Sequence, residues 1–309
     1  MTAESTSPPE GGVVRSGFVA LVGRPNAGKS TLVNAVVGSK VAITSDTPQT
    51  TRHRLRAIVD TDDAQVVLVD TPGLHKPHDA LGEQLNRSGL MALSDVDVAC
   101  LVVDGSAPVG AGDRWVAEHV AKSQGATVLV LTKADLVDQE RIDRQLAAAR
   151  ALVPFDDEVV VSAVEGFNVD GFVATVTALL PQGPRYFPRD MATDQPLEVM
   201  IAEFIREKVL RSTFDEVPHA VGVAVEDFEV VNGGELTRIA ATVFVERDSQ
   251  KGIIVGKGGE MIKRIGSEAR ADLERLLGSR VYLDLMVKVK RNWRRDAAQI
   301  RRFGYGEGL

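Results

Sequence analysis

The stretch "GRPNAGKST" at residues 23–31 constrains the fold of this chain more than any other. It follows the apolar run "GFVALVG" at 17–23, opens a helix-like stretch and fits the pattern G-x-x-x-x-G-K-[ST]. Between a strand and a helix, such glycines let backbone N–H groups fold around a phosphate, and the helix N-terminus adds partial positive charge. We expect Lys29 to bridge the β- and γ-phosphates of a nucleotide and the Ser30 hydroxyl to bind Mg²⁺. The expected contacts in this loop are Gly23, Asn26, Ala27, Gly28, Lys29, Ser30 and Thr31.

Apolar, Val-rich runs alternate with amphipathic stretches through the first half of the chain. Expected strands occupy 17–23, 64–70, 98–104, 126–132 and 158–163, and expected helices occupy 29–38, 83–94, 112–124, 139–152 and 168–180. Short apolar runs bounded by turn residues are typical of strands buried on both faces of a sheet. The stretch 57–70 is typical of a hairpin, which would add one antiparallel strand. The pattern predicts a doubly wound α/β domain with a mixed, mostly parallel sheet and ligands at the carboxyl ends of its strands.

The pattern changes after the proline-rich stretch "PQGPRYFPRD" at 181–190. A helix, two strands, a short helix, a longer helix and a further strand are expected to follow, which predicts a small α+β domain. A chain of 309 residues is also long for one hydrophobic core. The expected division is a disordered tail at 1–15, the α/β domain at 16–183, a linker at 184–195, and the α+β domain with a basic tail at 196–309.

Composition excludes several classes of protein. No run of about 18 apolar residues is present, so we expect no transmembrane helix. The polar, proline-rich start lacks the regions of a signal peptide, and the one cysteine, Cys100, lies in an apolar run, so we expect a cytoplasmic protein without disulfides. The net charge is −7, yet residues 247–302 carry 15 Lys and Arg against 7 Asp and Glu. That block suits a polyanionic partner, or it is a solvated helix face.

Three further motifs at expected strand ends select the nucleotide. In "LVDTPG", Asp70 can hold Mg²⁺ through water and the Gly73 N–H can meet a γ-phosphate. In "LTKAD", the Asp135 carboxylate can accept the two N–H donors on guanine's N1 and N2 edge, which adenine lacks, while the stem of Lys133 covers the purine. In "VSA", the Ala163 N–H can meet guanine O6. The expected contacts from these motifs are Asp70, Gly73, Thr132, Lys133, Asp135, Ser162 and Ala163. In this order along the chain, the motifs predict a GTPase.

These motifs also carry a resemblance to a known family. "GRPNAGKST", "TPQTTRHRLRAI", "DTPGL", "TKAD" and "SA", followed by a GxxG-bearing domain, resemble the bacterial Era GTPases from about Gly17 to Tyr305. The resemblance implies a Ras-like P-loop G domain joined to a C-terminal type II KH domain, with GTP, GDP and Mg²⁺ as ligands. It also implies binding to the 3′ end of small-subunit ribosomal RNA and a role in assembling the small ribosomal subunit. A cytoplasmic monomer is expected, with peripheral contact between the basic tail and anionic membrane as a further expectation.

Two positions depart from the patterns of related GTPases. Thr132 stands where the family commonly has an asparagine that ties the base site to the phosphate loop, and its shorter side chain predicts a weaker tie. Leu74 follows Gly73, where Ras-type enzymes carry a water-orienting glutamine, so intrinsic hydrolysis should be slow. Related GTPases use the position of Asn26 to hold a K⁺ ion in place of an arginine finger. The expected catalytic set is Asn26, Lys29 and Gly73, with K⁺ as a candidate cofactor.

The segment "TSDTPQTTRHRLR" at 44–56 resembles a first switch, which is ordered when GTP is bound. A threonine in this segment would touch Mg²⁺ and the γ-phosphate, and the sequence leaves Thr50 and Thr51 equally open. The expected Mg²⁺ set is Ser30, Thr50, Thr51 and Asp70.

A second glycine-rich turn, "GKGG" at 256–259, lacks what a nucleotide site needs, because no Ser or Thr follows its lysine. It suits the GxxG loop of a KH domain, which clamps about four nucleotides of single-stranded backbone. Nearby apolar residues could line the nucleic-acid groove or belong to the core: Ile253, Ile254, Met261 and Ile262. The expected RNA contacts are Gly256, Lys257, Gly258, Gly259, Lys263, Arg264, Lys288, Lys290 and Arg291.

The combined motifs predict a switch that binds and hydrolyses GTP, engages ribosomal RNA through the KH domain and is released by hydrolysis. Two alternatives stay open. One is a GTP-dependent RNA-binding checkpoint factor with incidental turnover, which Leu74 favours. The other is a tRNA-modification GTPase, which the KH-like second half and the lack of a C-terminal cysteine disfavour.

Overall fold

The computed structural model describes residues 14–77 and 79–305. The expected tail lies outside the described residues up to residue 13, and strand β1 (Val14–Gly23) begins two residues before the expected domain start. Val14 and Arg15 pair with the short antiparallel strand β7 (Gln182–Gly183). This pairing brings the two ends of the N-terminal unit together.

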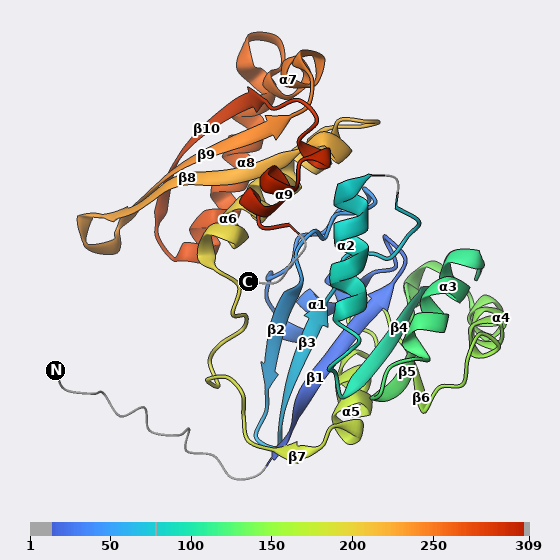
Figure 1. The fold of residues 1–309 in the computed structure, drawn as a ribbon. Coiled ribbons are helices and arrows are strands. Elements are labelled where there is room, and N and C mark those ends of the chain that lie inside the picture. Colours follow the sequence, from blue (N-terminus) through green and yellow to red (C-terminus); the bar gives the residue numbers. More distant parts are fainter. Residues whose placement is uncertain (1–13, 78, 306–309) are drawn as a thin grey trace.

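The N-terminal unit is built on a seven-stranded sheet of order β2-β3-β1-β4-β5-β6, with β7 beside β1 (Figure 1). Its remaining strands are β2 (Leu55–Asp60), β3 (Ala64–Asp70), β4 (Val98–Asp104), β5 (Ala126–Thr132) and β6 (Asp157–Val160). The hairpin strand β2 runs antiparallel to β3 as expected, and β3, β1, β4, β5 and β6 are parallel. The carboxyl ends of these parallel strands therefore meet at one edge of the sheet.

Helices cover both faces of this sheet, which is why its central strands β3, β1 and β4 are almost entirely buried. The helices are α1 (Lys29–Val37), α2 (Ala80–Met91), α3 (Ala111–Val120), α4 (Gln139–Arg150) and α5 (Val169–Leu179). Helices α1 and α5 pack into one core cluster, and α3 and α4 into the cluster on the other face. Helix α2 begins three residues earlier than expected, because the Asp79 carboxylate accepts the Gly82 N–H at 2.9 Å and caps it. Among the described residues, no helix is both long and apolar enough to cross a membrane.

The C-terminal unit is a three-stranded sheet of order β10-β9-β8 with its two longest helices on one face (Figure 1). Its elements are α6 (Leu197–Ser212), β8 (Gly222–Val231), β9 (Leu236–Val245), α7 (Asp248–Val255), α8 (Glu260–Leu277), β10 (Arg280–Val289) and α9 (Ala297–Arg302). Strand β9 pairs antiparallel with β8 and parallel with β10. Side chains of α6, α8 and the sheet share one core cluster. The order of these elements is the expected one, with α9 added inside the basic tail.

The two units touch along two surfaces. The segment expected as a linker follows the edge strand β2, where the Ile58 N–H donates to the Ala192 carbonyl at 2.9 Å. Helix α2 lies beside α9 (Figure 1), and Leu81 of α2 packs in a core cluster with Trp293 and Phe303. The C-terminal unit is therefore docked on the N-terminal unit through its last described residues as well as through α6.

Candidate nucleotide site and nucleic-acid interface

The phosphate loop folds around the ammonium group of Lys29. Its Nζ donates to the carbonyl oxygens of Gly23 at 3.2 Å and Arg24 at 2.9 Å, and the residue is 6% exposed. Burial lowers the pKa of Lys29 to about 8, although the charge of Asp70 opposes the shift. Gly28 has a φ of +88°, in the left-handed region that favours glycine. The loop thus places a buried cation at the N-terminus of α1, an arrangement that suits phosphate.

Three oxygen-bearing side chains from separate elements meet below the loop. The Ser30 hydroxyl donates to the Asp70 carboxylate at 2.6 Å and lies 2.8 Å from the Thr51 hydroxyl. Asp70 is fully buried, and among the described residues its Oδ1 has no hydrogen-bond partner. Burial raises the pKa of Asp70, while Lys29 and Ser30 oppose the rise. Hydroxyl and carboxylate oxygens with a free buried lone pair are the donor set that Mg²⁺ prefers.

The structure distinguishes the two switch threonines that the sequence left open. Thr50 turns its hydroxyl away from Ser30 and donates to the carbonyl oxygens of Thr47 at 2.6 Å and Ser45 at 3.3 Å. Thr51 alone of the two contacts Ser30. Of the expected Mg²⁺ set, the structure brings together Ser30, Thr51 and Asp70.

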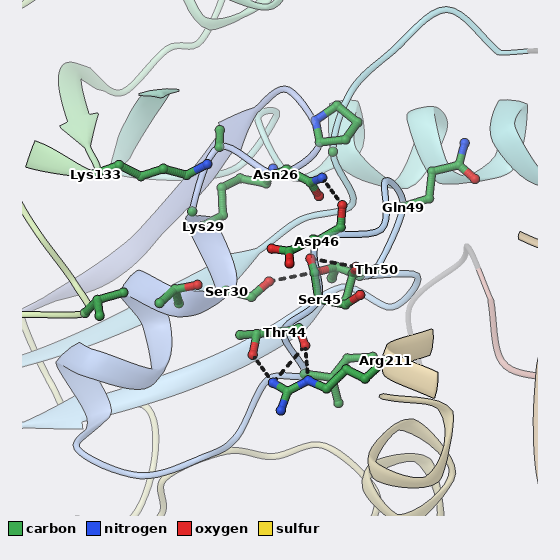
Figure 2. Close-up of a pocket in the computed structure, with 18 residues that line it drawn as sticks. Asn26, Lys29, Ser30, Thr44, Ser45, Asp46, Gln49, Thr50, Lys133 and Arg211 are labelled. Carbon is green, nitrogen blue, oxygen red and sulfur yellow. Dashed lines mark hydrogen bonds between the residues drawn. The ribbon is translucent and has the colours of Figure 1, made fainter. Parts of the chain in front are cut away.

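Asn26 links the phosphate loop to the first switch. Its side-chain amide donates to the Asp46 carbonyl at 2.5 Å (Figure 2), and its φ is +62°. Asparagine tolerates this left-handed conformation better than most residues. The side chain therefore ties the phosphate loop to a backbone carbonyl of the first switch.

The tie between the base site and the phosphate loop is present despite the threonine. Thr132 is buried, and its hydroxyl lies 2.7 Å from the Ala27 carbonyl and 3.1 Å from the Val103 carbonyl. The shorter side chain therefore still makes the tie, because β5 packs close enough to the loop for the hydroxyl to reach it. Lys133 is held by an ion pair of 2.6 Å with Asp104.

Asp135 is oriented by a residue of the last motif. Its Oδ1 accepts a hydrogen bond from the Ser162 hydroxyl at 2.5 Å, and Ser162 is buried. The sequence predicted Ser162 as a nucleotide contact, and the structure shows it in contact with Asp135. A fixed carboxylate loses less entropy when it pairs with a ligand edge. Ser162 thus serves the predicted guanine reader.

The "DTPG" motif packs tightly under the phosphate loop. The Leu74 N–H donates to the Gly23 carbonyl at 3.0 Å, and a Cβ added at Gly73 would lie 2.6 Å from the backbone of Pro25. Leu74 is 1% exposed and belongs to the core beneath α2 and α3. Its side chain is therefore absent from the nucleotide side of the loop.

A cavity of about 440 Å³ lies over these residues (Figure 2). It is lined by the expected residues Asn26, Ala27, Gly28, Lys29, Ser30, Thr31, Thr50, Thr51, Gly73 and Lys133. Gly23, Asp70, Thr132, Asp135, Ser162 and Ala163 do not line it and stand behind or beside it. Sequence reasoning missed Pro25, Ile43, Thr44, Ser45, Asp46, Gln49, Val164 and Arg211. Most of these lie within or next to the quoted segments, but Arg211 comes from α6 of the other unit and has no sequence signal.

The GKGG turn adopts a conformation that requires glycine. Gly256, Gly258 and Gly259 have φ of +73°, +61° and +82°. A Cβ at Gly256 would lie 2.7 Å from the side chain of Met261, whereas nothing stands within 4 Å of one at Gly258. Lys257 is exposed. The turn therefore offers an open, basic stretch of backbone to a ligand.

The basic residues expected around this turn are all exposed: Lys263, Arg264, Lys288, Lys290 and Arg291. Arg264 makes a weak ion pair of 3.9 Å with Glu268. Of the apolar neighbours, Ile254 is core, Met261 and Ile262 pack partly against the core, and Ile253 is 50% exposed. Ile253 is thus the best placed of the four to meet a ligand.

Comparison with known proteins agrees with this geometry. A family model described as a 50S ribosome-binding GTPase matches residues 18–133, and a KH domain model matches residues 216–294. The GTPase Era of Mycobacterium avium (strain 104) is 49% identical over 295 residues, which are 94% of this chain and 99% of that protein.

Two solved structures share the whole architecture. Era in complex with MgGDPNP and nucleotides 1506–1542 of 16S ribosomal RNA has a TM-score of 0.92 and 34% identity, over 95% of this chain and 100% of that one. An Aquifex aeolicus Era variant bound to GDP·AlF4⁻ matches with the same TM-score, identity and coverage. The expected fold class, a P-loop GTPase domain followed by a KH domain, is confirmed. Because the 49% identity extends over nearly the whole length of both chains, and because the motifs meet around Lys29 and Asp135, this chain belongs to the Era family of GTPases.

Proposed function

We propose that this protein is a GTP-binding and GTP-hydrolysing switch that binds the 3′ end of small-subunit ribosomal RNA through its KH domain and assists assembly of the small ribosomal subunit. The meeting of Ser30, Thr51 and Asp70 beside Lys29 carries the proposal, because it unites the phosphate loop, the first switch and the DTPG motif. The exposed GKGG turn and the solved Era complex with 16S ribosomal RNA support the choice of RNA.

At the phosphate end, Lys29 binds the β- and γ-phosphates, and the backbone of Gly23, Ala27, Gly28 and Thr31 surrounds them. Ser30 and Thr51 offer hydroxyl ligands to Mg²⁺, and Asp70 holds the ion through water. Mg²⁺ would neutralise charge that develops on the phosphate oxygens. The Gly73 N–H faces the γ-phosphate, and its lack of a side chain permits the close approach to Pro25.

At the base end, Asp135 reads the N1 and N2 edge of guanine and is held for this by Ser162. Lys133 covers the purine face, and the Ala163 N–H meets O6. Thr132 fixes the distance between base and phosphates through its contact with Ala27. These roles make the site selective for GTP and GDP over adenine nucleotides.

Hydrolysis proceeds without a side chain that orients water, since Leu74 is in the core. We propose that Asn26 and the Asp46 carbonyl hold a K⁺ ion near the phosphates, in the role that an arginine finger fills elsewhere. Intrinsic turnover is slow, and the GTP-bound protein therefore persists long enough to bind RNA before it hydrolyses the nucleotide.

Burial of Leu74 also favours the second candidate, a GTP-dependent RNA-binding checkpoint factor with incidental turnover. Single-turnover and steady-state GTP hydrolysis, each with and without a 3′-end rRNA fragment and K⁺, separate the two. Stimulation by RNA supports the switch. Tight GTP and RNA binding with a rate that RNA does not change supports the checkpoint factor, and no binding of guanine nucleotide at all rejects both.

We further propose a G domain at 16–183, extended by Val14 and Arg15 of β1, a docked linker at 184–195 and a KH domain from 196 onwards. RNA contacts are assigned to Lys257, Lys263, Arg264, Lys288, Lys290, Arg291 and the GKGG backbone. We place the protein in the cytoplasm as a monomer. Contact of the basic C-terminal segment with anionic membrane stays a prediction, which flotation with anionic and neutral vesicles would test.

A further inference from the structure

Of the 18 described residues that line the nucleotide cavity, all but one belong to the G domain. The exception is Arg211, in the last turn of α6, the first helix of the KH domain. Figure 2 shows its side chain reaching across from α6 towards Thr44. The KH domain therefore contributes directly to the wall of the nucleotide site.

Arg211 donates several hydrogen bonds to a single residue of the first switch, Thr44. Its Nε and Nη2 donate to the Thr44 carbonyl at 3.2 and 3.1 Å, and Nη2 also donates to the Thr44 hydroxyl at 2.9 Å. Glu207, one turn earlier on α6, accepts the Thr44 N–H at 3.0 Å and pairs with Arg211 at 3.2 Å. Helix α6 thus binds the N–H, the carbonyl and the hydroxyl of Thr44.

The other end of this short stretch is held by the phosphate loop. Asp46, two residues after Thr44, accepts the Asn26 amide through its carbonyl at 2.5 Å. In Figure 2 the two sets of hydrogen bonds lie at the two ends of the stretch Thr44, Ser45 and Asp46, which lines the cavity. A loop tied at Thr44 and at Asp46 has few conformations left. The position of the Asp46 carbonyl therefore depends on the contacts that Arg211 makes with Thr44.

Helix α6 is itself held in place by buried ion pairs and hydrogen bonds. Glu207 is fully buried. Lys40 of the G domain forms ion pairs with Glu207 at 2.5 Å and with Asp272 of α8 at 2.6 Å. Lys208 completes the cluster with a 2.5 Å ion pair to Asp272. The residue directly before Glu207, buried Arg206, donates to the Thr50 carbonyl. Arg211 consequently acts from a helix whose place relative to the first switch is fixed by several buried contacts.

We propose that Arg211 is a positioning residue of the GTPase site, supplied by the KH domain: it holds Thr44, and through it the Asp46 carbonyl beside Asn26, so that turnover depends on docking of α6. This inference rests on the proposed function and adds a residue to it. A guanidinium can bind the carbonyl and the hydroxyl together with its rigid fork, whereas a lysine ammonium reproduces these contacts only in part. An event that moves α6 would then displace Thr44 and change the hydrolysis rate without touching the nucleotide.

The test uses the full-length protein with Arg211→Ala and Arg211→Lys. Arg275→Ala is the matched control, because Arg275 also ion-pairs with a carboxylate of the cluster, Asp272, but contacts no residue of the G domain in the described contacts. Steady-state GTP hydrolysis gives kcat and KM, and fluorescent GDP gives nucleotide affinity.

We expect Arg211→Ala to lower kcat about tenfold, since small displacements of positioning groups cost this much or more. GDP affinity should stay within about twofold of the parent, because Lys29 and Asp135 are untouched. Arg211→Lys should recover part of the rate, and Arg275→Ala should match the parent. Hydrogen exchange of residues 44–50 should accelerate in Arg211→Ala with a GTP analogue bound.

Equal kcat in Arg211→Ala and the parent would overturn the inference. So would a loss of GDP affinity in step with kcat, because Arg211 would then be a ligand-binding residue. A fall in kcat that Arg211→Lys does not relieve, together with unchanged exchange at 44–50, would overturn it as well. Failure of the proposed function shows separately, as a parent protein that binds no guanine nucleotide, and the inference falls with it.

Discussion

The guanidinium carbon of Arg52 lies 5.2 Å from the centre of the Tyr305 ring, although the two residues stand near opposite ends of the described chain. Arg52 is 1% exposed and donates to the carbonyl oxygens of Val221 and His219, the latter at 3.1 Å. Arg52 directly follows Thr51, which contacts Ser30 in the proposed Mg²⁺ site. The first switch is therefore also a large part of the interface between the G domain and the KH domain.

Arg52→Ala should destabilise the docked arrangement. Its removal leaves buried carbonyl groups of the KH domain without a donor and opens a cavity against the Tyr305 ring, which together cost about 2–4 kcal/mol. Urea unfolding of the full chain measures the loss. Arg54→Ala, two residues further on and half-buried, is the control. Equal stabilities of the two variants would show that the Arg52 contacts contribute little.

Thr51→Ala should impair the GTPase site, and Thr50→Ala should spare it. Only the Thr51 hydroxyl contacts Ser30, whereas that of Thr50 closes a local turn through Thr47. We expect Thr51→Ala to lower turnover about tenfold, or ~1.4 kcal/mol of transition-state stabilisation, and to raise the Mg²⁺ concentration that gives half-maximal rate. Hydrolysis measured over a Mg²⁺ titration checks this. A larger loss of turnover in Thr50→Ala than in Thr51→Ala would instead assign the Mg²⁺ contact to Thr50.

Asp135→Ala should weaken binding of GTP by several kcal/mol. The variant loses two charge-assisted hydrogen bonds to guanine, each worth roughly 1.5–3 kcal/mol. Displacement of fluorescent GDP by GTP and by ATP measures the preference. Asp143→Ala, an exposed aspartate on the neighbouring helix α4, should leave it unchanged. An unaltered preference for GTP in Asp135→Ala would refute the assignment of this carboxylate.

Hydrolysis should be faster in K⁺ than in Na⁺, and the difference should vanish in Asn26→Ala. The Asn26 amide donates to the Asp46 carbonyl at 2.5 Å, so a K⁺ ion would take the place of this hydrogen bond and be held by the Asn26 amide oxygen and the Asp46 carbonyl oxygen. Rates in the two salts at equal ionic strength provide the measurement. Equal rates in the parent protein would leave Asn26 with a structural role only.

Replacing Lys257 and Gly258 with aspartate should abolish most RNA binding and spare GTP binding. A side chain at Gly258 meets nothing within 4 Å, and aspartate tolerates the left-handed φ of +61° better than most residues, so the fold should hold. Two negative charges then face the RNA backbone, and the log–log salt slope of binding should flatten as a phosphate contact is lost. A variant that bound RNA normally but lost GTP would make GKGG a nucleotide loop.

The sequence by itself determined the features that depend on neighbours along the chain. Strand–turn–helix order around Lys29, the hairpin before Asp70 and the glycine turn before α8 follow from local periodicity and from backbone conformations that glycine alone takes easily. Family motifs are local in the same sense, which is why Asp135 and Gly73 could be found from short stretches of sequence.

Only the tertiary structure decided the contacts between distant residues. Thr132 reaches the phosphate loop because β5 packs close to it, and Ser162 donates a hydrogen bond to Asp135. Thr51 was separable from Thr50 only by the direction in which each side chain points. Arg211 reaches Thr44 across 167 residues of sequence. Such meetings are set by how hydrophobic surfaces of separate units pack, and no pattern along the chain records which side chains that packing brings together.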